Sequence, residues 1–173
     1  MIRHAVIAAV LLAAIPVSGA LPAKAQQIGA DCQSPPLPGV NWHRCYLEDK
    51  PLAGVNLTGA ELRETRLLRA DLTGATLDEA DGRRARFMRA RAPGASFNGA
   101  DLREADFTRA NLARASFREA DLRRTRFLKA NLRGADFTGA RLDRTDLIDA
   151  DLTGAIWTDG AYICRTGSIG QCN

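Results

Sequence analysis

The sequence repeats every five residues, and this period restricts the possible folds more than any other feature. Between Ala100 and Ala140, every fifth residue from Leu102 to Phe137 is Leu or Phe. The residue two places before each is Ala, with Thr125 as the one exception. Neither the 3.6-residue period of a helix nor the two-residue period of a strand accounts for this pattern. A fixed short repeat indicates a solenoid, in which each unit packs only on its neighbours.

The five-residue phase extends well beyond this stretch. Residues 40–159 keep it for 120 residues, or 24 units, starting with Trp42 and ending with Trp157. Two units carry small residues at the central position, Gly82 and Ala92. The repeat therefore occupies most of the chain and predicts one continuous domain.

The units resemble those of the pentapeptide repeat family, whose consensus is Ala-(Asp/Asn)-Leu-x-x. The resemblance covers about 120 residues and is carried by segments such as Ala100-Asp101-Leu102 and Ala110-Asn111-Leu112. It implies an all-β fold, a right-handed quadrilateral parallel β-helix (a pentapeptide repeat solenoid) with four pentapeptides per turn and about six coils. The central residue and the small residue two places before it are then expected to point inward.

Folding the sequence at 20 residues per turn predicts how the core is filled. Phe87, Phe107 and Phe127 form one inward ladder, opposite a second ladder of Phe97, Phe117 and Phe137, with mainly Leu on the other two sides. Gly82 and Ala92 fall in the same coil. That layer is expected to be the least well filled, with a void of methyl size or larger.

The amino terminus has the composition of a secretory signal peptide. Arg3 precedes an unbroken apolar run from Ala5 to Ile15, and Ala23-Lys24-Ala25 is a small-x-small cleavage site. The run is too short for a membrane-spanning helix, so we expect residues 1–25 to be removed and no transmembrane anchor to remain. This predicts an exported protein, periplasmic or secreted. Without Arg3 and Lys24, the formal net charge falls from +4 to +2.

The four cysteines follow the signal segment, and their even number predicts two disulfides in an exported chain. The spacing does not fit zinc, and His43 is the only histidine after the signal. In the implied fold, Cys45 and Cys164 lie more than about 20 Å apart, too far for a bridge. We therefore pair Cys32 with Cys45 and Cys164 with Cys172. Residues 26–39 are expected to form an irregular amino-terminal cap, and residues 160–173 a disulfide-linked carboxyl-terminal cap.

The sequence contains no recognisable catalytic arrangement. His43 has no evident nucleophile or orienting acid, and no nucleophile-elbow signature surrounds Ser96, Ser116 or Ser168. Paired acids occupy consensus repeat positions, where hydrogen bonds to the coil corners explain them: Asp81, Asp101 and Asp121. Phosphate-binding glycine motifs are absent from the sequence, and Gly74, Gly94, Gly134 and Gly154 mark a tight corner instead. We predict a protein that is not an enzyme and holds no cofactor or metal.

Two outward columns form the candidate binding face. One consists of Arg63, Arg83, Arg103 and Arg123, beside a corner column of Arg44, Glu64, Arg84, Glu104, Arg124 and Arg144. Either these charges pair across coils or the arginines bind anions. The other is an apolar column with a parallel basic one: Leu68, Met88, Leu128 and Ile148, then Arg69, Arg89, Arg109 and Lys129. Such a column indicates either a contact with another protein molecule or packing within the ladder.

These features favour a non-enzymatic exported protein that acts as a protein-binding or structural scaffold in the cell envelope. Its contact would be an unknown protein partner or a second copy of the chain. The alternative implied by the family resemblance is a DNA-mimicking protein that binds gyrase, but such mimicry requires an acidic surface and a cytoplasmic location. Direct binding of nucleic acid is disfavoured because few aromatic residues accompany the basic ones.

Overall fold

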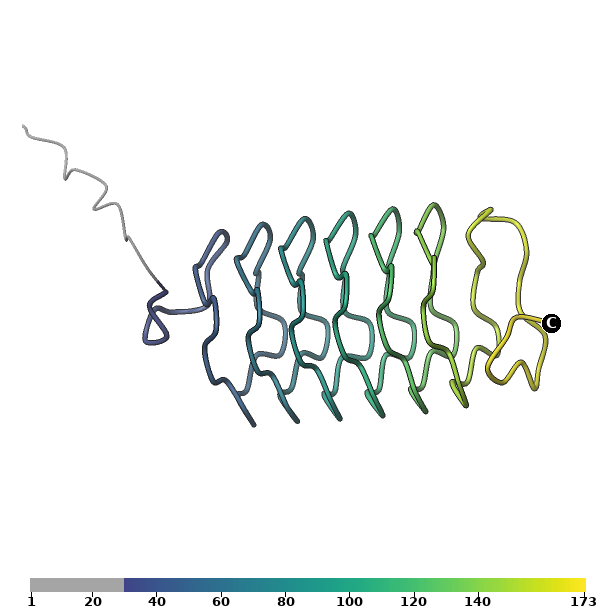
Figure 1. The fold of residues 1–173 in the computed structure, drawn as a ribbon, viewed down its shortest axis with the longest axis horizontal. Helices are drawn as coiled ribbons and strands as arrows, with labels where there is room; N and C mark the ends of the chain where they lie inside the picture. Colours follow the sequence, from purple (N-terminus) through teal and green to yellow (C-terminus); the bar gives the residue numbers. More distant parts are fainter. Residues whose placement is uncertain (1–29) are drawn as a thin grey trace, which may run out of the picture.

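The computed structural model describes residues 30–173, which form a rod of stacked coils (Figure 1). The amino-terminal segment enters at one end of the rod and the carboxyl terminus lies at the other. The expected signal peptide, residues 1–25, and the first four residues of the expected amino-terminal cap lie outside the described residues.

Parallel backbone bridges between residues 20 apart hold the coils together. They run from Asn41↔Glu61 to Asp136↔Ile156. The Leu102 amide donates to the Asp121 carbonyl at 2.9 Å, and the Asp121 amide donates to the Ala100 carbonyl at 2.9 Å. Each pentapeptide contributes one isolated bridge residue, so residues 30–173 contain no longer strand and no helix. One turn therefore has four sides of five residues; the total of about six coils remains a prediction.

The four sides give the rod four faces, which we number in chain order. Face 1 contains residues 40–44 and their counterparts at each twentieth residue, face 2 residues 45–49, face 3 residues 50–54 and face 4 residues 55–59, with their counterparts. Within each pentapeptide, the first and third residues point inward, the second and fourth point outward, and the fifth occupies the corner.

Two ladders of phenylalanine rings fill the middle of the rod. Phe87 stacks on Phe107 with ring centroids 4.5 Å apart, and Phe107 stacks on Phe127 at 5.2 Å. The opposite ladder, on face 4, meets this one edge to face, as between Phe107 and Phe117 at 6.1 Å. All six rings are fully buried. The prediction of two opposed aromatic ladders is thus confirmed, and their contact makes them one continuous aromatic core.

Two exceptions to the repeat are accommodated in different ways. The Thr125 hydroxyl donates to the carbonyl of Leu102 at 2.7 Å, so a buried polar group keeps its hydrogen bond. At Gly82, a Cβ atom would lie 2.8 Å from Leu102 Cδ2. The side chain of Leu102 therefore occupies the space left by the glycine. No methyl-sized space therefore remains beside the backbone at Gly82. The expected poor filling of the layer that also contains Ala92 stays a prediction.

Each end of the rod carries one disulfide. Cys32 and Cys45 are joined across a Cα–Cα distance of 5.4 Å, and Cys164 and Cys172 across 4.9 Å. This is the pairing expected from the sequence. The carboxyl-terminal tail folds back antiparallel on the last coil, with bridges Asp151↔Ile169 and Ile156↔Ile163.

The tail covers only part of the last coil. Its hydrogen bonds reach residues 150–157, on faces 3 and 4. On faces 1 and 2 no further coil follows, and the inward residues Leu142 and Leu147 stay half-buried. Within residues 30–173, no helix is long and apolar enough to cross a membrane.

The aromatic core generates a stability prediction. Phe107 contacts four other rings, so F107A should remove stacking and leave a cavity between two coils. We expect the free energy of unfolding, measured by denaturant titration, to fall by about 3–5 kcal/mol. The matched control is R109A, an exposed site in the same pentapeptide, with an expected change within about 0.5 kcal/mol. Equal losses for both variants would contradict an aromatic core that stabilises the rod.

Candidate binding surface

Face 1 carries a continuous ladder of arginine and aspartate side chains. Arg83 Nη2 lies 2.6 Å from Asp81 Oδ2, and Arg83 Nε lies 3.4 Å from Asp101 of the next coil. Arg103 repeats this arrangement, at 2.6 Å from Asp101 and 3.7 Å from Asp121. The second and fourth residues of each pentapeptide point outward together, so each arginine reaches the acid of its own coil and approaches the next. Each aspartate also accepts the predicted hydrogen bond from the turn backbone, as Asp81 does from the Arg83 amide at 3.4 Å, and the pairing with arginine side chains is an additional role.

This pairing lowers the pKa of two of the acids. The pKa of Asp81 falls from 3.8 to about 2, mainly because Arg83 donates hydrogen bonds to it, with a further contribution from Arg63. The pKa of Asp121 is lowered mainly by the hydrogen bond from Arg123. The arginines of face 1 are therefore largely occupied by their own acids.

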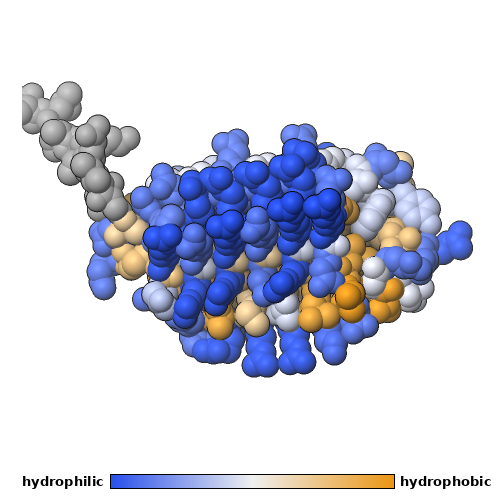
Figure 2. Space-filling view, viewed as in Figure 1, coloured by the Kyte–Doolittle hydropathy of each residue, from blue (hydrophilic) through white to orange (hydrophobic). Residues whose placement is uncertain are grey.

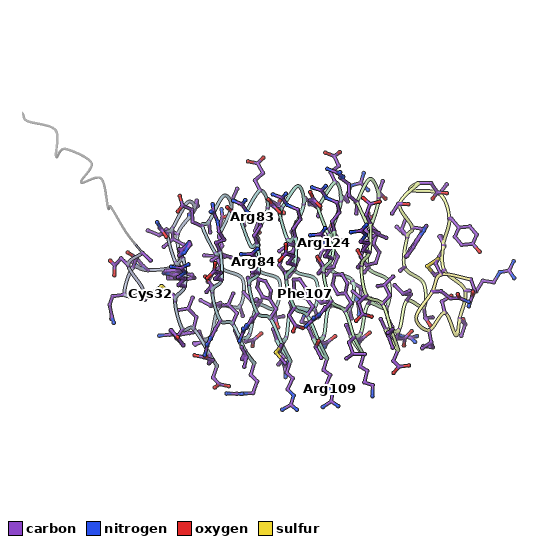
Figure 3. The ribbon with its side chains drawn as sticks, in the orientation of Figure 1. Cys32, Arg83, Arg84, Phe107, Arg109 and Arg124 are labelled. Atoms are coloured by element: carbon purple, nitrogen blue, oxygen red, sulfur yellow. A yellow bond between two sulfur atoms is a disulfide. The ribbon has the colours of Figure 1, made fainter. Side chains whose placement is uncertain are left out.

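The corner between faces 1 and 2 alternates in sign from Arg44 to Arg124, as the sequence predicted, and ends with a second arginine, Arg144. Arg44 Nε lies 2.9 Å from Glu64, and Arg84 Nε lies 3.0 Å from Glu104. Arg124 approaches Glu104 from the other side at 3.9 Å. The expected self-pairing across coils is thus present in this column. Figure 3 shows Arg83, Arg84 and Arg124 along the upper part of the rod.

Face 2 differs, because its outward apolar column lies at the bottom of a groove of about 310 Å³. Leu68, Met88, Thr108 and Leu128 form the floor and are half-buried. The corner column of face 2 forms one wall: Arg69, Arg89, Arg109 and Lys129. Figure 3 shows Arg109 extending away from the ribbon at the lower edge, and Figure 2 shows apolar atoms between hydrophilic rows. One residue of the predicted face departs from this pattern, since Ile148 is 61% exposed beyond the end of the groove. Thr108 interrupts the apolar floor, as its place in the column between Met88 and Leu128 predicted.

The cations around the groove are only partly paired. Arg69 binds Asp49 at 2.6 Å, and Lys129 lies 3.9 Å from Asp149. Between them, Arg89 and Arg109 are exposed and form no ion pair with any described residue. Across the floor, the exposed Arg86 also has no ion-pair partner within residues 30–173, and neither does Arg126. The fold therefore leaves a cluster of available guanidinium groups on this face.

The corners explain why faces 1 and 2 are unusual. Every corner residue of these two faces is charged and has a positive φ of 56–60°. On faces 3 and 4 the corner is most often glycine, as at Gly74 and Gly99, which adopts such φ values without steric cost. A side chain with a Cβ in this conformation costs about 1 kcal/mol. At twelve corners, therefore, a charged residue adopts a strained backbone conformation that glycine would adopt without strain.

The charges of the repeat are unevenly shared among the faces. Faces 1 and 2 hold 16 of the cationic and 12 of the anionic side chains of residues 40–159, whereas faces 3 and 4 hold 5 and 7. The outer surface therefore has a basic side and a weakly acidic side.

The structure does not assemble a catalytic site from the residues considered in the sequence. The His43 amide donates to Asn41 Oδ1, Ser96 donates to Asp78, and Ser116 donates to Asn98. Ser168 is buried and accepts a hydrogen bond from the Asn173 amide. Within residues 30–173 there is no group of three or more His, Cys, Asp or Glu side chains arranged to hold a metal ion.

Sequence reasoning missed part of this surface. On the other side of the groove floor, Arg66, Arg86 and Arg126 share a column with Asp106 and Asp146, and Arg66 lies over the Tyr46 ring at 4.5 Å. The signal was present in the sequence as arginine at the second position of the units on face 2. Other units of the same face carry the consensus acid at this position, as at Asp106 and Asp146, so the arginines do not form an unbroken run.

A square coil of five-residue sides, joined by a parallel ladder, defines the class of quadrilateral β-helix proteins. The family model for pentapeptide repeats matches in eight copies, over residues 52–87, 66–103, 94–127 and 115–154. This chain belongs to the pentapeptide repeat family. Proteins of this family form right-handed quadrilateral β-helices, in agreement with the predicted fold.

Several solved structures are similar to the chain. HetL, a protein involved in the regulation of heterocyst differentiation in the cyanobacterium Nostoc sp. strain PCC 7120, is 30% identical, covering 71% of this chain and 70% of its own, with a TM-score of 0.30. A pentapeptide repeat protein of the Arabidopsis thaliana thylakoid lumen is 25% identical over 72% and 81%, with a TM-score of 0.28. QnrB1, a plasmid-mediated fluoroquinolone resistance protein, is 19% identical over 68% and 67%, with a TM-score of 0.36. No curated protein matches.

The acids of face 1 generate a pH prediction. Asp81 has a lower pKa in the folded protein than the ordinary 3.8, so its contribution to stability is fully present above pH 3.8 and is lost as the pH falls towards about 2. We expect D81N to be less stable than the parent at neutral pH, with a difference that shrinks across this interval in acid-titrated thermal melts. The control is D143N, because Asp143 is exposed and makes no ion pair with any described residue. A difference for D81N that is independent of pH would exclude this linkage.

The strained corners generate a second prediction. R89G should raise the free energy of unfolding by about 0.5–1 kcal/mol, because glycine relieves the positive φ. R86G should lower it by a similar amount, since Arg86 lies in the bridged backbone, where glycine only adds chain entropy. R89A removes the charge but keeps the Cβ and so isolates the electrostatic part. A destabilised R89G would mean that this corner is unstrained.

Proposed function

We propose that this protein is a non-enzymatic, exported binding module that serves as a protein-binding or structural scaffold in the cell envelope. Its contact surface is formed by faces 1 and 2. The observation that carries the proposal is the set of charged corners, because each keeps a charged side chain where glycine would be less strained. On faces 3 and 4, most corners carry glycine and are therefore less strained.

The chemistry of the described residues supports binding over catalysis. The serines considered as catalytic within the repeat form hydrogen bonds between successive coils, as Ser116 does by donating to Asn98. The basic groove of face 2, by contrast, combines a recessed apolar floor with exposed guanidinium groups. Such a surface can hold a partner without any reaction taking place.

The cysteine chemistry supports the exported location. Both disulfides lie at the ends of the rod, and disulfides persist in oxidising compartments. Together with the signal-like residues 1–25, this favours the periplasm or the exterior of the cell.

The alternative, a DNA-mimicking gyrase-binding protein, fits the charge distribution poorly. Mimicry of a duplex requires a dense row of acidic groups. The most strongly charged side of this rod is basic, and its acids on face 1 are paired with arginines. A supercoiling assay with purified protein tests this alternative directly, since a mimic would inhibit gyrase.

Site-specific photocrosslinking in the exported fraction of living cells tests the proposed surface. A photoreactive amino acid is placed at Thr108 on face 2 or at Ala113 on face 3. These residues occupy the same position of adjacent pentapeptides and are both half-buried. We expect crosslinks at Thr108 and few at Ala113. Crosslinks to a second copy would assign the contact to self-association, whereas equal yields at the two positions, or none at Thr108, would refute the surface.

A further inference from the structure

The basic corner column of face 2 has a charge order that internal pairing does not explain. Its six residues read Asp49, Arg69, Arg89, Arg109, Lys129 and Asp149 along the rod. The neighbouring corner column of face 1 alternates Arg and Glu from Arg44 to Arg124 and pairs within itself over that length. Four successive cations, one coil or roughly 4.8 Å apart, instead repel one another. Only the first and last are neutralised, by Asp49 and Asp149.

The apolar floor lies directly beside this column. Leu68, Met88 and Leu128 are half-buried, whereas Arg89 and Arg109 beside them are exposed. On the other side of the floor stand Arg86 and Arg126, which also have no ion-pair partner among the described residues. The result is a straight groove with an apolar bottom and a cationic wall on one side, whereas the column on the other side is mixed in charge, with Asp106 between Arg86 and Arg126.

Resting on the proposed binding function, we infer that this groove binds an acidic segment of another protein chain that carries apolar side chains. Carboxylates of the segment pair with the unpaired Arg89 and Arg109 of the corner column, and its apolar side chains contact the floor. The added negative charge also relieves the repulsion between Arg69, Arg89, Arg109 and Lys129. Charge complementarity therefore identifies the chemistry of the partner.

Two other occupants fit the groove less well. A second copy of the chain placed groove to groove would set one row of cations against another, which is unfavourable in a contact that excludes water. A flat anionic membrane surface would meet the exposed arginines but would not reach the recessed floor.

Binding of designed peptides to the purified disulfide-bonded protein tests the inference. The probe is a fluorescent peptide of alternating Asp and Leu, about ten residues long, which exceeds the floor at roughly 3.3 Å per residue. Matched peptides replace Leu by Ser or Asp by Lys. We expect the Asp–Leu peptide to bind best, and the variant R89E/R109E to weaken its binding by about tenfold or more, corresponding to about 1.4 kcal/mol.

The control variant R91E/R114E makes the same charge change on face 3, at two exposed arginines without ion pairs to described residues, and should bind as the parent does. The inference would be overturned if R89E/R109E and R91E/R114E weakened peptide binding equally, or if the Asp–Ser peptide bound as tightly as the Asp–Leu peptide. The inference would also be overturned if the protein bound phosphatidylglycerol vesicles more strongly than the peptide and R89E/R109E weakened that vesicle binding to the same extent. Self-association of the protein that R89E/R109E abolishes would overturn it as well. Failure of all peptides alongside crosslinking at Thr108 would reject the acidic partner while leaving the binding function in place. Thermal melts confirm that both variants are folded.

Discussion

The rest of the structure depends on the parallel backbone ladder between residues 20 apart. It requires each side of the coil to be five residues long, with two residues turned inward and a corner at the fifth. Because successive coils stack in register, residues at equivalent positions lie directly above one another. Any bias at one position of the repeat therefore becomes a column. Inside the rod, this places Phe87, Phe107 and Phe127 in a stack. Outside, it turns a preference for Arg or Asp at one position into a line of charge.

A column of charged side chains is favourable only when each charge has an ion-pair partner. On face 1 the partners come from the fold itself, because Arg103 of the same coil pairs with Asp101 and Arg83 of the preceding coil approaches it. In the corner between faces 1 and 2, residues of opposite charge such as Arg84 and Glu104 follow one another and form ion pairs. The corner column of face 2 has neither of these arrangements. Its charges are not needed to hold the coils together, since the ladder and the aromatic core already do so, and the acidic segment inferred above would supply their partners.

The core of this fold was predictable from sequence, whereas its surface was only partly so. The period of five identified the inward residues, because burial and small size are required at fixed positions of a narrow coil. The filling of Gly82 by Leu102 was not predictable, since it depends on how one leucine tilts between two coils. The 20-residue turn predicted which residues share a column on each face, but it did not predict which of them form ion pairs. From the sequence, Asp81 could bind its corner amide, Arg63 or Arg83. In the structure its carboxylate accepts hydrogen bonds from Arg83 Nε, Arg83 Nη2 and Arg63 Nη2. The positive φ at Arg89 and the equivalent corner residues could not be predicted, because a charged residue does not indicate a left-handed backbone conformation in the way that glycine does.

Rigidity links the fold to the kind of binding that faces 1 and 2 can perform. Side chains on a stacked ladder are held at a constant spacing before any partner arrives, so association orders little of the backbone. The acids at the ends of the face 2 corner limit how much of this surface is available. Asp49 neutralises Arg69 and Asp149 approaches Lys129, so the available charge is concentrated at Arg89 and Arg109 in the middle. The acidic segment inferred above would therefore be selected by the position of its acidic groups as well as by their number, because acids placed beyond the two central coils would meet Asp49 or Asp149 and be repelled.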